Sequence, residues 1–217
     1  MTNKYIDRIL KFSENDFISL ACKDRKNDVF HSNMTNDGKH RSLGLLRKTD
    51  YCNYISLNLF KDKNRTKSNI KNLNGFMLDF DEGNISELVE NFESIFGKAT
   101  WKIRTTPSKG KTQLIYLFKD KENRIDIAEK VSFTITRFGK GDTNTWDLPR
   151  MFRHPESVNG KNGELTTVID SGIEYSLDYF IEKLKDNSIG ILLPPNNSYS
   201  NNQKKNGKVN SIRKKVP

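Results

Sequence analysis

The stretch NGFMLDFD, residues 74–81, predicts a buried β-strand that ends in two acids. Successive side chains of a strand point to opposite faces, so every second residue shares a face. One face is therefore expected to carry three apolar side chains, Phe76, Leu78 and Phe80. Asp79 and Asp81 fall together on the other face. The two carboxylates are expected to point in the same direction from the end of one strand.

Helices and strands are predicted on both sides of this stretch. The clearest is a helix that begins after Asn84, has Glu87 at the capping-box position, carries an apolar stripe and ends before Gly97. Alternation and turn residues predict the others: strands at 52–60, 99–106, 111–118 and 165–172, and helices at 125–138 and 175–184. The strands at 99–106 and 111–118 flank a turn at 107–110 and are expected to form a hairpin. Residues 139–164 are expected to be irregular. This mixed order predicts an α+β fold with an antiparallel or mixed sheet.

Length and composition predict one folded domain, residues 1–192, followed by a basic tail or linker, residues 193–217. The chain has 217 residues, of which 34% are hydrophobic and 29% charged. The tail is rich in Asn, Ser and Lys and is expected to be disordered. It holds six of the ten net positive charges of the chain. A basic surface gains counterion-release free energy on binding a polyanion, so nucleic acid is a candidate partner.

Membrane and disulfide-rich classes are not indicated. No apolar run is long enough for a membrane span, and residues 1–10 lack the apolar region of a signal peptide, so a cytoplasmic protein is expected. The two cysteines, Cys22 and Cys52, are far apart in the sequence and are expected to be ordinary reduced thiols.

The acidic pair is the strongest candidate for chemistry. Asp79 and Asp81 are close enough on one strand face to share hard cations, and their mutual repulsion is costly unless Mg²⁺ or Mn²⁺ neutralises it. Two-metal nucleotidyl transfer needs this arrangement. The alternative is that the strand simply runs out into the polar turn that follows it.

Two later segments offer groups that suit phosphate oxygens. The predicted hairpin turn, residues 105–111, combines hydroxyl groups, a glycine and two lysines. The segment DLPRMFRHP, residues 147–155, has an acid that could complete a metal site and two arginines that could bind phosphates. Surface ion pairs on a loop are the alternative interpretation of that segment.

Taken in order, these stretches resemble a known family. SLNLF at 56–60, Arg65, FMLDFDEG at 76–83, TTPSKGKTQLIYLF at 105–118 and DLPRMFRHPESVNGK at 147–161 look like the archaeo-eukaryotic primase superfamily, especially the primase-polymerase domains of plasmid and phage replication proteins. The resemblance spans residues 52–161. It implies a sheet like that of the RNA-recognition motif joined to an N-terminal α/β unit, with the active site in the cleft between them.

The resemblance also implies roles for individual residues. Asp79 and Asp81 match the paired metal ligands, and Asp147 matches the third carboxylate, with Asp142 as a rival. Nucleotide contacts are implied for Gln113, Arg150 and Arg153. Ser108 and Lys111 of the hairpin turn are candidates for the same role because a hydroxyl and an ammonium group suit phosphate oxygens. Gln113 stands where the family has a histidine that contacts phosphates, and a neutral amide brings no positive charge. The family more often has Pro-Gly where this chain has Pro155-Glu156, so the local turn is expected to differ.

The expected function is therefore that of a DNA primase, a DNA polymerase or both: a nucleotidyltransferase that uses Mg²⁺ or Mn²⁺ to join NTPs or dNTPs on a single-stranded DNA template. A helicase, fused or recruited, is a possible partner, because no ATPase motif is present in this sequence. One alternative is a non-catalytic DNA-binding module of a replication initiator. Another is a nuclease that uses the same acids for phosphodiester hydrolysis.

Overall fold

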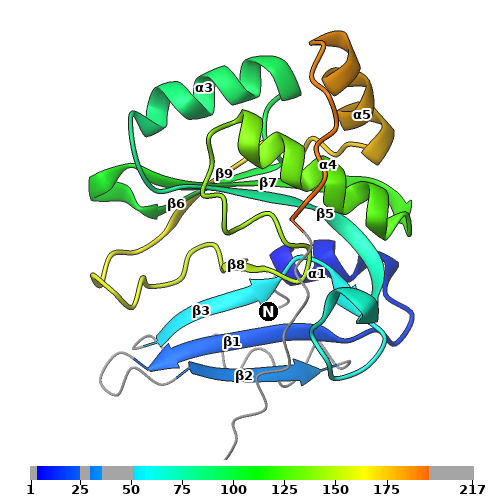
Figure 1. Ribbon diagram of the computed structural model, residues 1–217. Coiled ribbons are helices and arrows are strands. Elements are labelled where there is room, and N and C mark those ends of the chain that lie inside the picture. Colours follow the sequence, from blue (N-terminus) through cyan, green and yellow to red (C-terminus); the bar gives the residue numbers. More distant parts are fainter. Residues whose placement is uncertain (1–3, 25–29, 36–50, 196–217) are drawn as a thin grey trace, which may run out of the picture.

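The computed structural model describes residues 4–24, 30–35 and 51–195. Three layers are stacked in this part of the chain: a layer of helices, a five-stranded sheet and a four-stranded sheet (Figure 1). The strand pairings of both sheets are antiparallel, and the α+β class is confirmed. The predicted tail lies, from residue 196 onward, outside the described residues. None of the helices in the described segments has the length and apolar character to span a membrane.

The five-stranded sheet is the central layer and has the strand order β4-β5-β7-β6-β9. Its strands are β4 (Leu59–Phe60), β5 (Ile70–Phe80), β6 (Trp101–Thr106), β7 (Lys111–Glu122) and β9 (Thr167–Asp170). β5 confirms the strand predicted at 74–81, although it begins four residues earlier and ends at Phe80. β6 and β7 form the predicted hairpin, in which Gly110 closes the turn with a φ of 68°, in the left-handed region that glycine favours.

Three helices cover one face of this sheet: α3 (Ile85–Phe96), α4 (Ile125–Phe138) and α5 (Leu177–Asp186) (Figure 1). α3 and α4 begin and end where the sequence predicts. Asn84 lies at the N-cap of α3, but its side chain donates to the Glu87 carboxylate at 2.9 Å rather than capping the backbone. The apolar face of β5 packs against these helices in a core that includes Phe76, Leu78 and Phe80.

The four-stranded sheet lies against the other face and has the order β2-β1-β3-β8. Its strands are β1 (Ile18–Asp24), β2 (Phe30–Thr35), β3 (Tyr51–Ser56) and β8 (Met151–Arg153). A second core between the two sheets contains Trp101 and Phe152, together with residues of α1 (Lys4–Ile9). The central strands β5 and β7 are thus buried on both faces over most of their length, whereas the edge strand β9 is largely exposed. The described segments also contain three short 3-10 helices: Leu10–Phe12, Lys67–Asn69 and Pro107–Lys109.

Two predictions about strands are wrong. The single strand expected at 52–60 is two strands, because the chain leaves β3 at Ser56 and enters the other sheet as β4 at Leu59. The buried Asn58 holds this crossing: its Nδ2 donates to the Leu148 carbonyl at 2.8 Å, and its Oδ1 accepts from the Asn74 backbone N–H at 2.8 Å. The second error is β8, which lies within the stretch expected to be irregular.

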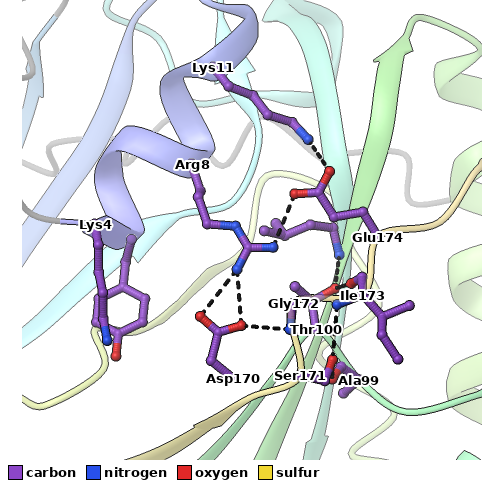
Figure 2. Close-up of polar contacts among 12 residues, drawn as sticks. Lys4, Arg8, Lys11, Ala99, Thr100, Asp170, Ser171, Gly172, Ile173 and Glu174 are labelled. Carbon is purple, nitrogen blue, oxygen red and sulfur yellow. Dashed lines mark hydrogen bonds and ion pairs between the residues drawn. The ribbon is translucent and has the colours of Figure 1, made fainter.

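The N-terminal helix α1 is joined to the last strand of the sheet by charged groups (Figure 2). The Arg8 guanidinium donates to both carboxylate oxygens of Asp170, at 3.0 and 3.2 Å, and to Glu174 at 3.0 Å. Lys11 also pairs with Glu174. These contacts join residues more than 160 positions apart in the sequence.

Candidate active site

An open pocket of about 450 Å³ lies where β5 and β7 of one sheet meet β8 of the other. It is lined by six of the eight site residues that the sequence predicts, namely Asp79, Asp81, Lys111, Gln113, Arg150 and Arg153. The remaining two, Asp147 and Ser108, do not line it. The pocket also includes residues to which the prediction gave less weight or none, among them Tyr54, Lys109, Asp142 and Lys161. Acids and bases from four separate parts of the chain are therefore brought together.

Asp79 occupies the end of β5, on the face opposite the helices. Its Oδ2 accepts a hydrogen bond from Gln113 Nε2 at 2.8 Å, whereas its Oδ1 is shielded from solvent and has no hydrogen-bond partner. Burial raises the pKa of the Asp79 carboxyl to about 6, the hydrogen bond from Gln113 opposes this rise, and the charges of Asp81 and Asp142 add to it. A carboxylate in this position requires a counter-charge to ionise readily.

The two other acids of the pocket differ in their surroundings. Asp81 follows the last residue of β5, is exposed, and lies 3.5 Å from the Lys111 ammonium. Asp142 lies on the loop after α4, where its backbone N–H donates to the Asp79 carbonyl oxygen at 2.7 Å. One Asp142 carboxylate oxygen accepts from the Asn144 backbone N–H at 2.9 Å. The backbone bond fixes Asp142 beside the acidic pair, so the structure places this residue, and not Asp147, in the pocket.

Gln113 lines the pocket and connects the two sheets. The register of the ladder places it directly opposite Asp79 on the neighbouring strand. Its amide nitrogen donates to Asp79, and its amide oxygen accepts from the Arg153 backbone N–H at 3.0 Å. The phosphate contact implied for this residue would have to use a side chain that already makes two hydrogen bonds within the protein.

The two arginines of the segment 147–155 are held in different ways. The Arg153 guanidinium stacks on the Tyr54 ring, 4.9 Å from its centroid, and donates to the Tyr54 hydroxyl at 3.1 Å. Arg150 is partly exposed, and its Nε donates to Asp147 Oδ1 at 2.7 Å. Asp147 therefore pairs with an arginine of the pocket while lying outside the pocket itself.

Ser108 also has a partner within the protein. Both its hydroxyl and its backbone N–H donate to the Glu164 carboxylate, at 2.7 and 2.8 Å. These bonds hold the turn of the β6–β7 hairpin against the loop that precedes β9. They lower the pKa of Glu164, with the backbone hydrogen bond as the largest cause. The cations that this turn contributes to the pocket are Lys109 and Lys111.

The end of the stretch 147–161 supports the β6–β7 hairpin at the same side of the pocket. Asn159 donates to the Thr105 carbonyl oxygen at 2.7 Å and to the Thr106 hydroxyl at 2.9 Å, and its Oδ1 accepts from the Lys161 backbone N–H. Glu156 has a φ of 61°, so the glutamate itself adopts the left-handed conformation that glycine favours. Its presence after Pro155 thus does not exclude a glycine-type turn.

The acids of the pocket fit Mg²⁺ or Mn²⁺ in their chemistry. Hard divalent cations prefer carboxylate oxygens, and Asp79 presents a buried oxygen with no hydrogen-bond partner next to two further acids. Among the described residues, no three acidic, histidine or cysteine side chains are close enough to form a complete metal site. The carboxylates are thus of the chemical type that binds these cations, but they do not form a complete coordination site in this structure.

Comparison with known proteins gives structural matches only, since neither a protein-family model nor a curated protein matches the sequence. The chain is similar to the archaeo-eukaryotic primase domain of the cyanophage S-2L primase-polymerase, with a TM-score of 0.65 and 13% identity, over 83% of this chain and 95% of that one. It is also similar to the catalytic domain of the primase RepB′, solved in complex with initiator DNA, with a TM-score of 0.59 and 11% identity, over 85% and 94% of the two chains. These matches show that the chain has the fold of phage and plasmid primase domains, as the sequence resemblance implies.

Proposed function

We propose that this chain is a primase-polymerase catalytic domain, which joins nucleoside triphosphates on a single-stranded DNA template with the help of Mg²⁺ or Mn²⁺. One observation carries the proposal: a single pocket between the two sheets holds the acids Asp79, Asp81 and Asp142 together with five cationic side chains, namely Lys109, Lys111, Arg150, Arg153 and Lys161. The fold shared with phage and plasmid primase domains supports it.

The acids would hold the divalent cations. Asp79 offers a buried oxygen, and Asp81 and Asp142 lie close enough to raise its pKa. When bound, the cations would activate the primer 3′-hydroxyl and stabilise the leaving pyrophosphate. Asp142 is the third carboxylate in this proposal. Asp147, which the sequence favoured for that role, is better placed to orient Arg150, because a carboxylate at 2.7 Å fixes the guanidinium.

The cations would bind the triphosphate. Lys109 and Lys111 enter the pocket from the hairpin turn, and Arg150 and Arg153 enter from the opposite sheet and its preceding loop. Arg153 is held against Tyr54, so its guanidinium loses little conformational entropy on binding a phosphate. Apolar surface at Met77 and Met151 remains for the sugar or base of the nucleotide.

The template would be bound mainly through its phosphates, in keeping with the net charge of +10. A helicase, fused or recruited, would supply unwinding. The nucleotide could be an NTP or a dNTP, and both should be offered in the assay.

The test is nucleotide incorporation by the purified chain with labelled NTPs or dNTPs, single-stranded template and Mn²⁺, with and without a primer. Asp79→Asn and Asp142→Asn should each lower the rate at least about 100-fold, because each removes a charge that would bind the cations. Asp147→Asn should lower it about tenfold through Arg150. The matched control is Asp120→Asn, which changes an exposed acid on β7 outside the pocket and should keep full activity.

Full activity of Asp79→Asn would contradict the proposal. If the wild-type chain incorporates no nucleotide and Asp79→Asn still binds DNA, the chain would instead be a non-catalytic DNA-binding module. Cleavage of the template without incorporation would support a nuclease.

A further inference from the structure

We infer that Gln113 is a positioning residue for the cation-binding carboxylate Asp79, and that it does not act as a phosphate contact. The inference deepens the proposed function and rests on it, because it assigns a task to a side chain of the same site. It depends on two hydrogen bonds and one oxygen without a partner.

The orientation of the Gln113 amide is fixed by its partners. An ionised carboxylate can only accept a hydrogen bond, so the amide nitrogen must face Asp79 Oδ2 at 2.8 Å. A backbone N–H can only donate, so the amide oxygen must face Arg153 at 3.0 Å. Both partners require the same orientation, and a flipped amide would lose both bonds.

This orientation has a consequence for Asp79. With Oδ2 held by Gln113, the carboxylate plane is fixed, and Oδ1 is the atom left without a hydrogen-bond partner. A metal ligand that is held in this way by an outer hydrogen bond does not have to be ordered when the cation arrives. Gln113 therefore selects which oxygen of Asp79 is available.

The second bond links this carboxylate to the opposite sheet. β5 and β7 belong to the five-stranded sheet, whereas Arg153 ends β8 of the four-stranded sheet. Gln113 thus sets the position of an acid of the pocket relative to the strand that carries one of its arginines. Because the side chain is buried and both its polar groups are engaged, contact with a triphosphate would require these bonds to break.

The test measures Mn²⁺ affinity of the full chain by titration calorimetry, without nucleotide or DNA. Gln113→Met keeps the approximate volume and removes both hydrogen bonds. It should weaken Mn²⁺ binding about 10- to 100-fold, the usual effect of losing an outer-shell partner. Gln113→His, whose neutral ring has one N–H donor and one acceptor nitrogen, should bind Mn²⁺ within about threefold of wild type.

A matched control separates positioning from general loosening. Ser132→Ala removes the 2.8 Å hydrogen bond from α4 to the Trp146 carbonyl, which supports the loop of Asp142 from outside the pocket. Its Mn²⁺ affinity should stay within about threefold of wild type. Thermal unfolding of each variant verifies that the chain is folded.

Two results would overturn the inference. One is that Gln113→Met binds Mn²⁺ as tightly as wild type, whether or not its KM for the triphosphate rises. The other is that Ser132→Ala weakens Mn²⁺ binding as much as Gln113→Met does. In each case the proposed function would stand. If wild type binds no Mn²⁺, or if Asp79→Asn binds it equally well, the proposed metal site fails and the inference fails with it.

Discussion

Replacing Asp79 by asparagine should stabilise the protein in the absence of divalent cations, although it should abolish activity. The folded-state pKa of about 6 lies above 3.8, the ordinary pKa of an aspartate side chain. The folded state therefore holds the proton of this carboxyl more tightly than the unfolded state does. The stability that this proton contributes is complete below pH 3.8, declines as the pH rises, and is lost above the folded-state pKa.

The magnitude follows from the difference between the two pKa values. At about 1.4 kcal/mol per pKa unit, the raised pKa of Asp79 lowers the stability of the folded protein, relative to a side chain that does not titrate, by about 3 kcal/mol at pH 8 and about 1.5 kcal/mol at pH 5. An asparagine side chain avoids this cost, and its Oδ1 can still accept the hydrogen bond from Gln113. The gain should thus roughly double between pH 5 and pH 8.

The assay is urea unfolding of wild type and Asp79→Asn at both pH values, in buffer with a chelator. Asp120→Asn, an exposed substitution, is the control and should change the free energy of unfolding by less than about 0.5 kcal/mol. Adding Mn²⁺ should stabilise wild type and Asp120→Asn, which keep the acids of the pocket, but not Asp79→Asn. The reasoning is refuted if Asp79→Asn is no more stable than wild type at pH 8, or if its gain is the same at both pH values.

Three further predictions concern the framework around the site. A Cβ at Gly75 would lie 1.9 Å from the Tyr116 carbonyl oxygen, so Gly75→Ala should lower the free energy of unfolding in urea by more than about 3 kcal/mol or prevent folding. Gly110 has open space around it, so Gly110→Ala should lower that free energy by only about 1 kcal/mol, because of the positive φ. Equal losses for the two variants would contradict this reasoning. Arg8→Met should lower the free energy of unfolding by about 1–2 kcal/mol, and by less in 1 M salt, because it removes the ion pairs with Asp170 and Glu174. The control Lys4→Met should leave the urea midpoint unchanged, because the nearest acid is 4.0 Å away. A loss for Arg8→Met that is insensitive to salt would argue against the ion pairs. Asp147→Asn should raise the KM for the triphosphate about tenfold with Mn²⁺ affinity unchanged in calorimetry, and weakened Mn²⁺ binding would restore Asp147 as a metal ligand.

The sequence predicts the elements whose side-chain period is strong and whose ends are marked. α4 begins and ends where expected, and α3 ends at Gly97, which has a φ of 80°. The segment 52–60 fails for a physical reason. A continuous apolar run fits a strand buried in either sheet, and only the tertiary hydrogen bonds of Asn58 show that the chain changes sheets there.

The sequence likewise predicts some features of the site and not others. Strand alternation predicts that Asp79 and Asp81 share a face. The structure agrees for Asp79, whose side chain lies on the face opposite the helices. Asp142 and Asp147 both lie in loops, where no period relates sequence spacing to position. A backbone hydrogen bond to the Asp79 carbonyl oxygen holds Asp142 beside the pocket, and that bond has no signature in the sequence.

The role of Gln113 depends on register. It faces Asp79 because residue 79 pairs with residue 113 across the β5–β7 ladder. These strands are not joined by a tight turn, since α3 and β6 lie between them in the sequence, so turn chemistry does not set their alignment. The resemblance to the primase family suggests that Gln113 contacts the nucleotide, whereas the strand pairing shows that Gln113 is a neighbour of Asp79.

The ion pairs between α1 and the end of β9 also matter while the protein is being made on the ribosome. Tyr5, Ile6 and Ile9 pack beside Trp101, and the charged partners of Arg8 are Asp170 and Glu174. At a synthesis rate of roughly 5–20 residues per second, the first helix waits on the order of ten seconds or more for residue 174 to be added. During that interval its apolar side chains have no completed sheet to cover them. The nascent chain should therefore be a substrate for chaperones until synthesis of the domain is nearly complete.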